Sequence, residues 1–315
     1  MDKQPILQKF PVYLKIITFG MIILASVILI LIFGIVLAVP FFGPDVMKNL
    51  AIMGDSTDPE LIALAKYFQI VSQVGMFLVP TILFAFLDGR NIWAYLKLNI
   101  RPLFMTFVFS FLAIFAAVPL INFLSEWNAQ MSLPASLKNV EIWMKDAEDK
   151  AAIVTANFLN VTTPGGFLIN ILMIGIIPAI GEELLFRGVL QKLFHQWSKN
   201  IHVSVILAAF LFSAIHMQFY GFIPRFMMGV MLGYVFVWSG SLWAPILIHF
   251  TNNSAAVLIA YLQSAGSADN TFDTVGTGNS SVLPVIMSTL LTGIFLFLIY
   301  YIEKKKKERI SISEK

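Results

Sequence analysis

The sequence predicts an all-α fold, a polytopic transmembrane helical bundle of about eight helices. Of the 315 residues, 58% are hydrophobic and only 12% are charged, whereas soluble domains carry about 25% charged residues. Apolar runs of about 20 residues, the length that crosses a bilayer, recur along the chain. Lys and Arg gather in alternate connections between these runs. Together these observations indicate a chain that crosses a membrane repeatedly.

The apolar runs supply the expected helices in order. The first is longer than the roughly 7–15-residue apolar core of a cleaved signal peptide, so we expect an uncleaved signal anchor. Residues 137–158 place apolar side chains among charged ones at helical spacing, which predicts an amphipathic helix on the membrane surface. The runs lie at about 16–39, 66–87, 102–124, 167–197, 202–218, 222–239, 242–262 and 282–302.

Charge placement predicts the orientation. Fourteen of the 21 Lys and Arg residues fall on the side of the two termini, six fall on the other side, and Arg187 lies inside an apolar run. By the positive-inside rule both termini are cytoplasmic. We therefore expect a multi-pass protein of the cell (inner) membrane. The chain has no cysteine, which excludes disulfides, thiolate metal sites and a cysteine nucleophile.

The stretch 178–187 places three charged residues inside the fourth apolar run. An ionisable residue there costs roughly 2.5–3.5 kcal/mol and is a functional-site candidate. Glu183 and Arg187, four residues apart in a helix, face the same side and can form an ion pair. Glu182 points about 100° away from Glu183, so its partner must come from another helix.

Two of the four histidines lie in or near apolar runs and could supply that partner. His216 follows the turn at 199–200 by about as many residues as Glu182 precedes it, so antiparallel helices place the two at one depth. His249 reaches the same depth if the hairpin at 199–200 projects roughly 15 Å into the cytoplasm. The other two histidines flank the turn, and we expect them in solvent.

These groups can hydrolyse an amide bond. Glu182 and His216 could hold and deprotonate a water. His249 and Asn253, at i and i+4 on one helix face, could donate hydrogen bonds to the oxyanion. Alternatively, Glu182, His216 and His249 could be three ligands of a catalytic zinc with an open fourth position. The His-Glu-x-x-His spacing of soluble zinc proteases is absent, and the residues do not choose between the two mechanisms.

Three motifs together resemble the CAAX protease and bacteriocin-processing (CPBP) family of intramembrane endopeptidases, which includes the Abi and type II CAAX prenyl endopeptidase groups. The resemblance covers about residues 165–260. The motifs, in family order, are Glu182-Glu183-x-x-x-Arg187, Phe212-x-x-x-His216 and His249-x-x-x-Asn253.

The resemblance implies a role for each residue. Glu182 would activate water together with His216. His249 and Asn253 would form the oxyanion hole, and Glu183 with Arg187 would be structural support. Family members are often described as metalloproteases, so a bound zinc stays an alternative to a metal-free mechanism.

The resemblance also implies a division of the chain and a set of partners. We expect N-terminal transmembrane helices and outside loops over 1–162, the catalytic core over 163–262, and the last transmembrane helix with a basic cytoplasmic tail over 263–315. The first three helices and the last would provide membrane context only. Expected partners are a peptide or protein substrate, itself free or membrane-associated, and the lipid bilayer, but no nucleic acid.

Two other functions stay open. A non-enzymatic membrane scaffold or immunity protein would keep the polar cluster for structure. An ion-coupled transporter would use Glu182 and His216 as a proton relay. Gly229-x-x-x-Gly233 predicts a close helix contact, which packing within the chain explains better than dimerisation.

Overall fold

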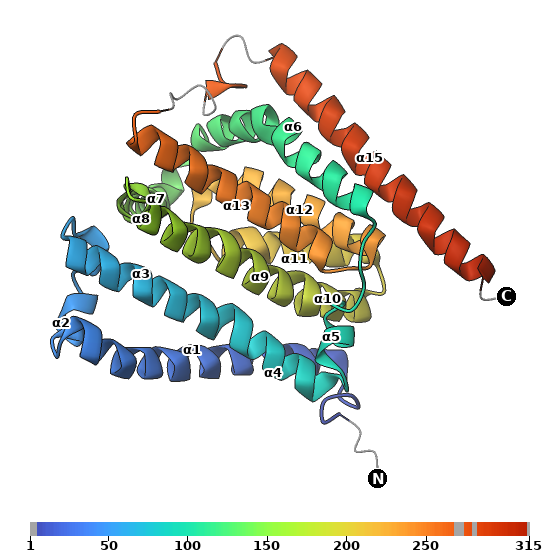
Figure 1. The fold of residues 1–315 in the computed structure, drawn as a ribbon, viewed down its shortest axis with the longest axis horizontal. Helices are drawn as coiled ribbons and strands as arrows, with labels where there is room; N and C mark the ends of the chain where they lie inside the picture. The colour runs from blue at the N-terminus through green and yellow to red at the C-terminus, as the bar shows by residue number, and fades with distance from the viewer. Residues whose placement is uncertain (1–4, 268–273, 279–281, 314–315) are drawn as a thin grey trace.

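The computed structural model describes residues 5–267, 274–278 and 282–313, and every regular element in this part of the chain is helical (Figure 1). The predicted all-α polytopic bundle is therefore confirmed. Seven helices of the described part are long and apolar enough to cross a membrane: Val12–Phe42, Pro59–Asp88, Phe104–Ala129, Pro164–Ser198, Phe219–Ser239, Trp243–Ser264 and Val282–Arg309.

The fifth predicted run forms a helix that is shorter than the thickness of the bilayer core. Helix α11 (Ile201–Ala214) has 14 residues, a length of about 21 Å against about 30 Å for the bilayer core. The chain leaves the helix after Ala214, and Met217 adopts a left-handed φ of 54°. The eight predicted runs thus correspond to seven long helices and one short one. Both ends of the chain lie at the same end of the bundle (Figure 1).

Two of the spans consist of several helical segments joined end to end. The second span joins α3 (Pro59–Gln73), the π-helical segment η2 (Val74–Leu78) and α4 (Val79–Asp88). The fourth joins α8 (Pro164–Asn170), the π-helical η4 (Ile171–Ile176), α9 (Ile177–Glu183), the π-helical η5 (Leu184–Leu190) and α10 (Gln191–Ser198). The other elements are α1 (Val12–Phe42), α2 (Val46–Leu50), η1 (Met53–Asp55), α5 (Ile92–Tyr95), α6 (Phe104–Ala129), η3 (Ala135–Leu137), α7 (Lys138–Leu159), η6 (Phe219–Gly221), α12 (Phe222–Ser239), α13 (Trp243–Ser264) and α15 (Val282–Ser313).

Proline accounts for two of the π-helical segments. Pro80 in α4 and Pro178 in α9 each stand in the first turn after such a segment. Proline has no N–H to bond the carbonyl four residues earlier, so the helix cannot keep its regular ladder at that point. The wider π turn absorbs the break, and π-bulges occur frequently at functional sites. Both breaks border the site described below.

The amphipathic helix predicted over 137–158 is α7, which packs on η6. The rings of Trp143 and Phe219 have centroids 5.3 Å apart. The Glu148 carboxylate accepts a hydrogen bond of 3.2 Å from the Tyr220 N–H. Helix α7 therefore holds the connection between α11 and α12, three residues beyond His216.

Residues near the start of helix α15 contact the middle of α6. Pro119 interrupts α6. One residue later the Ser288 hydroxyl of α15 enters the helix ladder: it donates to the Ala116 carbonyl at 2.5 Å and accepts from the Leu120 N–H at 3.1 Å. A side chain inserted in this way bends a helix and links it to its neighbour.

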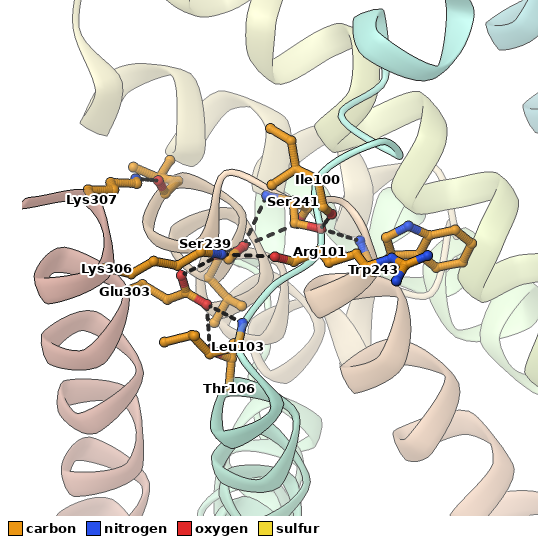
Figure 2. Close-up of polar contacts among 12 residues, drawn as sticks. Ile100, Arg101, Leu103, Thr106, Ser239, Ser241, Trp243, Glu303, Lys306 and Lys307 are labelled. Carbon is orange, nitrogen blue, oxygen red and sulfur yellow. Dashed lines mark hydrogen bonds and ion pairs between the residues drawn. The ribbon is translucent and has the colours of Figure 1, made fainter. Parts of the chain in front are cut away.

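A second contact joins α15 to the start of α6, at the end of the bundle where the termini lie (Figure 2). Glu303 is fully buried and accepts from the Leu103 N–H at 3.0 Å and from the Thr106 hydroxyl at 2.6 Å. A carboxylate at a helix N-terminus satisfies free N–H groups and favours the helix dipole. Lys306 donates to the Arg101 carbonyl at 2.8 Å. The expected basic tail thus begins as a continuation of helix α15.

Candidate active site

The ion pair expected between Glu183 and Arg187 forms in the core. Arg187 Nη1 lies 2.7 Å from Glu183 Oε1, and the two side chains are 1% and 0% exposed. A buried pair is stable only when its other hydrogen-bonding groups are satisfied. Arg187 Nη2 donates to the Gly229 carbonyl at 2.8 Å. The guanidinium carbon also lies 4.8 Å from the centroid of the Phe212 ring, a cation–π distance. The pair therefore joins the fourth span to α11 and α12.

Two glycines of α12 allow the helices to approach closely. A Cβ atom at Gly229 would lie 3.0 Å from Ala209 Cβ, and one at Gly233 would lie 2.9 Å from Val205 Cγ1. Gln191, one helical turn after Arg187, donates to the Gly233 carbonyl at 3.2 Å. The close contact expected at Gly229-x-x-x-Gly233 is thus confirmed as packing within the chain.

His249 lies between the two glutamates. Its Nδ1 is 2.9 Å from Glu183 Oε1, and its Nε2 is 3.9 Å from Glu182 Oε2. Because Glu183 Oε1 is already the acceptor for Arg187, the His249 ring donates from Nδ1 and its Nε2 is turned toward Glu182. A carboxylate behind a histidine fixes its tautomer and ring orientation. Glu183 therefore orients His249 in addition to pairing with Arg187, a contact that the spacing of the motifs did not indicate.

Glu182 and His216 line one pocket, as the depth comparison predicted. The pocket has a volume of about 190 Å³. Glu182 is 4% exposed, and among the described residues its Oε2 has no hydrogen-bond partner. His216 Nδ1 lies 2.8 Å from the Phe212 carbonyl. A carbonyl can only accept, so Nδ1 carries the hydrogen and Nε2 of the neutral ring is an acceptor.

Phe212 packs among the polar groups. Its ring makes edge contacts with those of Phe186, His216 and His249, at centroid distances of 5.3, 5.5 and 5.7 Å. The Phe212 ring therefore contacts residues of η5, of α13 and of the segment that follows α11. Phe212 thus packs against both histidine rings.

Asn253 lies one turn beyond His249 and bonds to the fourth span. Its Nδ2 donates to the Ile174 carbonyl at 3.0 Å. Ile174 is four residues before Pro178, which has no N–H to bond that carbonyl. Asn253 therefore satisfies a carbonyl that proline leaves without its usual helical partner. It is not among the residues that line the pocket of Glu182 and His216.

The arrangement does not fit the alternative of a zinc site formed by Glu182, His216 and His249. Among the described residues, no group of three or more His, Cys, Asp or Glu side chains is placed to hold a metal ion. Glu182 and His249 approach each other at 3.9 Å. His249 and His216 each bond through Nδ1, to Glu183 and to the Phe212 carbonyl, and both leave Nε2 available. The zinc site does not fit because Glu182 and these two rings are not placed to share one ion.

Sequence reasoning missed the contribution of the second span. Gln69, Ser72 and Gln73 of α3 line the pocket together with Glu182 and His216. The first three helices were expected to provide membrane context only, and this expectation is wrong for α3. The signal available in the sequence was three polar side chains within five residues of an apolar run. The two remaining histidines, His195 and His202, are exposed as expected.

Comparisons with known proteins agree with the motifs. A family model described as type II CAAX prenyl endopeptidase Rce1-like matches residues 164–255. The chain is 31% identical over 85 residues to the uncharacterized protein YpbD of Bacillus subtilis (strain 168); this stretch is 26% of the chain and 40% of the relative. The chain thus spans less than half the length of the curated relative it matches. No solved structure matches. The predicted resemblance is confirmed over the matched residues, which include all three motifs.

Proposed function

From the match of residues 164–255 to type II CAAX prenyl endopeptidases, we propose that this multi-pass membrane protein is an intramembrane endopeptidase. It hydrolyses a peptide bond with an activated water. The observation that carries the proposal is the pocket of Glu182 and His216: a buried carboxylate with an oxygen that has no partner among the described residues. Two other buried carboxylates, Glu183 and Glu303, also have one oxygen without a partner, but the other oxygen of each accepts two hydrogen bonds. The Glu182 side chain accepts no hydrogen bond from the described residues, which is unusual for a purely structural carboxylate.

In the proposed reaction Glu182 and His216 hold the attacking water. Glu182 Oε2 and His216 Nε2 are both acceptors, so one water can donate a hydrogen to each. The water oxygen bonds to the carbonyl carbon while one of these groups takes its proton. The C–N bond then breaks, and the proton passes to the departing amine nitrogen. Both groups are ready for the next turnover.

His249 and Asn253 are proposed to stabilise the oxyanion formed in this step. His249 turns Nε2 toward Glu182 and donates from it when the ring is protonated. One hydrogen of Asn253 Nδ2 goes to the Ile174 carbonyl, and the proposal uses the other. Glu183 and Arg187 support the site by holding the His249 ring and the three helices around it.

The proposed setting is the cell (inner) membrane, with both termini in the cytoplasm. The excess of Lys and Arg on the side of the termini supports this orientation. The substrate is a peptide or a membrane-associated protein that reaches the pocket between α3 and α9.

The test compares purified wild type with Glu182→Gln, each reconstituted in liposomes together with solubilised membrane proteins as candidate substrates. Mass spectrometry of newly formed chain termini identifies any cleaved protein and its scissile bond. We expect products with wild type and none with Glu182→Gln, whose unfolding temperature should match that of wild type. Equal product formation by the two proteins would overturn the proposal.

A non-enzymatic scaffold or immunity protein is the second candidate. The buried network of Glu183, Arg187 and His249 favours it, because its internal bonds would stabilise a fold without any reaction. In that case Glu182→Gln retains the phenotype of wild type in cells, and substitutions in the network remove it through loss of protein. Cell assays with both kinds of variant separate the two functions.

A further inference from the structure

Two glutamines of α3 face the proposed reaction centre. Gln69 and Gln73 line the same pocket of about 190 Å³ as Glu182 and His216. They stand four residues apart on one helix, so their side chains point to the same side. Both lie outside residues 164–255, the part of the chain that matches the endopeptidase family.

The Gln73 side chain has an unsatisfied buried atom. Its Oε1 is inaccessible and has no hydrogen-bond partner among the described residues, as is also true of Glu182 Oε2. A buried acceptor without a partner is unfavourable, and native structures contain few of them. Other buried polar atoms of the described residues also have no partner, but Gln73 and Glu182 line the same pocket. Two such acceptors on the walls of one pocket indicate a ligand that supplies hydrogen-bond donors.

The chemistry of a peptide main chain fits these walls. A carboxamide carries one donor group and one acceptor, the same pair that a peptide unit presents. Residues i and i+4 of a helix are separated by about 6 Å along its axis. In an extended peptide, residues i and i+2 are about 6.6 Å apart and face the same way. Gln69 and Gln73 can therefore bond two alternate peptide units of one extended chain.

The membrane makes such contacts necessary. A carbonyl inside an intact helix is covered by the neighbouring turn, so the segment to be cleaved must leave its helix. Its N–H and C=O groups then have no internal partners, and in the bilayer core they must find them in protein. Carboxamides on the wall opposite Glu182 meet that need.

We propose that Gln69 and Gln73 bind the main chain of the substrate in an extended conformation beside the scissile bond. This inference rests on the proposed endopeptidase function and names the substrate class: a peptide segment that is unwound at the cleavage site. Ser72, exposed between the two glutamines, lies where that segment would enter.

The test uses Gln73→Met and Gln69→Met, which keep the length of the side chain and remove its hydrogen bonds. The probes are a synthetic peptide with the cleaved sequence found by terminus mapping, and analogues in which one main-chain N–H at a time is replaced by an ester oxygen. With wild type, the ester at the contacted position should lower kcat/KM roughly tenfold. With the corresponding Met variant, the same ester should have no further effect, because the contact is already lost.

Gln130→Met is the matched control. Gln130 is exposed at the end of α6, outside the pocket, so this variant should show the full ester effect of wild type. A Met variant that fails to fold is replaced by Gln73→Asn, which keeps the amide but shortens its reach and should also lose the ester effect.

Two results are decisive and differ from failure of the proposed function. If Glu182→Gln is inactive but every ester lowers kcat/KM equally in wild type and in the Gln69 and Gln73 variants, the main-chain contact is wrong and the endopeptidase function stands. If Glu182→Gln cleaves the peptide like wild type, the endopeptidase function itself is wrong, and this inference falls with it.

Discussion

Glu182 and Glu183 are adjacent, but their carboxylates lie in different surroundings. Glu183 Oε1 accepts from Arg187 at 2.7 Å and from His249 at 2.9 Å. Glu183 Oε2 has no partner among the described residues, as is also true of Glu182 Oε2. The Glu182 side chain, however, accepts no hydrogen bond from the described residues and only approaches the His249 ring, at 3.9 Å. The roughly 100° between successive helical side chains produces this difference. One carboxylate is part of the core network, and the other faces the pocket.

Amide substitutions at these two positions should therefore affect different properties: activity at Glu182 and stability at Glu183. Glu182→Gln removes the proposed base and should lower kcat by about 10²–10⁴-fold while leaving the unfolding temperature unchanged. Glu183→Gln leaves Arg187 without its partner and should cost about 3–5 kcal/mol of stability. Peptide cleavage and thermal unfolding in detergent measure the two effects. Loss of stability in Glu182→Gln, with normal stability in Glu183→Gln, would reverse the assignment.

Arg187→Lys should fail although it keeps the charge. The guanidinium bonds Glu183 through Nη1 and the Gly229 carbonyl through Nη2, and it also faces the Phe212 ring. An ammonium group is a point charge and cannot reproduce the planar fork. We expect a lower unfolding temperature than in the control Arg309→Lys, a surface position. Equal unfolding temperatures would show that charge alone is sufficient.

The sequence predicted the residues of the site better than their contacts. The i, i+4 spacing gives the Glu183–Arg187 pair, and counting from the turn at 199–200 gives the shared pocket of Glu182 and His216. The contact between Glu183 and His249 could not be predicted, because it depends on the rotation of α13 about its axis. Hydropathy gives the position of a helix along the membrane normal but not that rotation.

At the scale of elements, the segments were predictable and their internal geometry was not. The apolar runs locate the spans, but the pattern of apolar residues does not distinguish 3.6 residues per turn from a π segment. Three π segments therefore came only from the structure: η2, η4 and η5. The run predicted over 202–218 also ends too late: α11 ends at Ala214, although Ile215 and Met217 continue the apolar pattern after the helix.

The break in the fourth span connects Pro178 with Asn253. Pro178→Ala restores an N–H that can bond the Ile174 carbonyl, which Asn253 Nδ2 now satisfies at 3.0 Å. Asn253→Ala should therefore cost stability in the wild-type background and less in the Pro178→Ala background. A double-mutant cycle of unfolding free energies gives the coupling, which we expect at about 0.5–3 kcal/mol. Strict additivity would mean that Asn253 does not support the proline break.

At the scale of the molecule, the site depends on both halves of the chain. The family match and the three motifs are confined to the second half, yet α3 supplies one wall of the pocket. A Cβ at Gly181 would lie 2.9 Å from Phe77 Cβ, so the two broken spans pack in close contact beside the pocket. The three motifs consist of residues proposed to act in or support the reaction, whereas the two glutamines that line the pocket belong to no motif.

The packing of α9, α11 and α13 also decides whether the site can bind a metal ion. These helices bring Glu182, His216 and His249 into one region, but in the described part of the chain no three carboxylate or imidazole groups are placed to share an ion. Glu183 and the Phe212 carbonyl each hold one Nδ1, which fixes the orientation of the two rings and leaves each Nε2 available. Peptide cleavage should therefore continue at the same rate after treatment with EDTA and 1,10-phenanthroline, with a zinc protease in the same liposomes as the positive control. Metal content measured on the treated protein must be negligible for the result to count. Loss of activity on chelation and its return on addition of zinc would contradict the metal-independent mechanism.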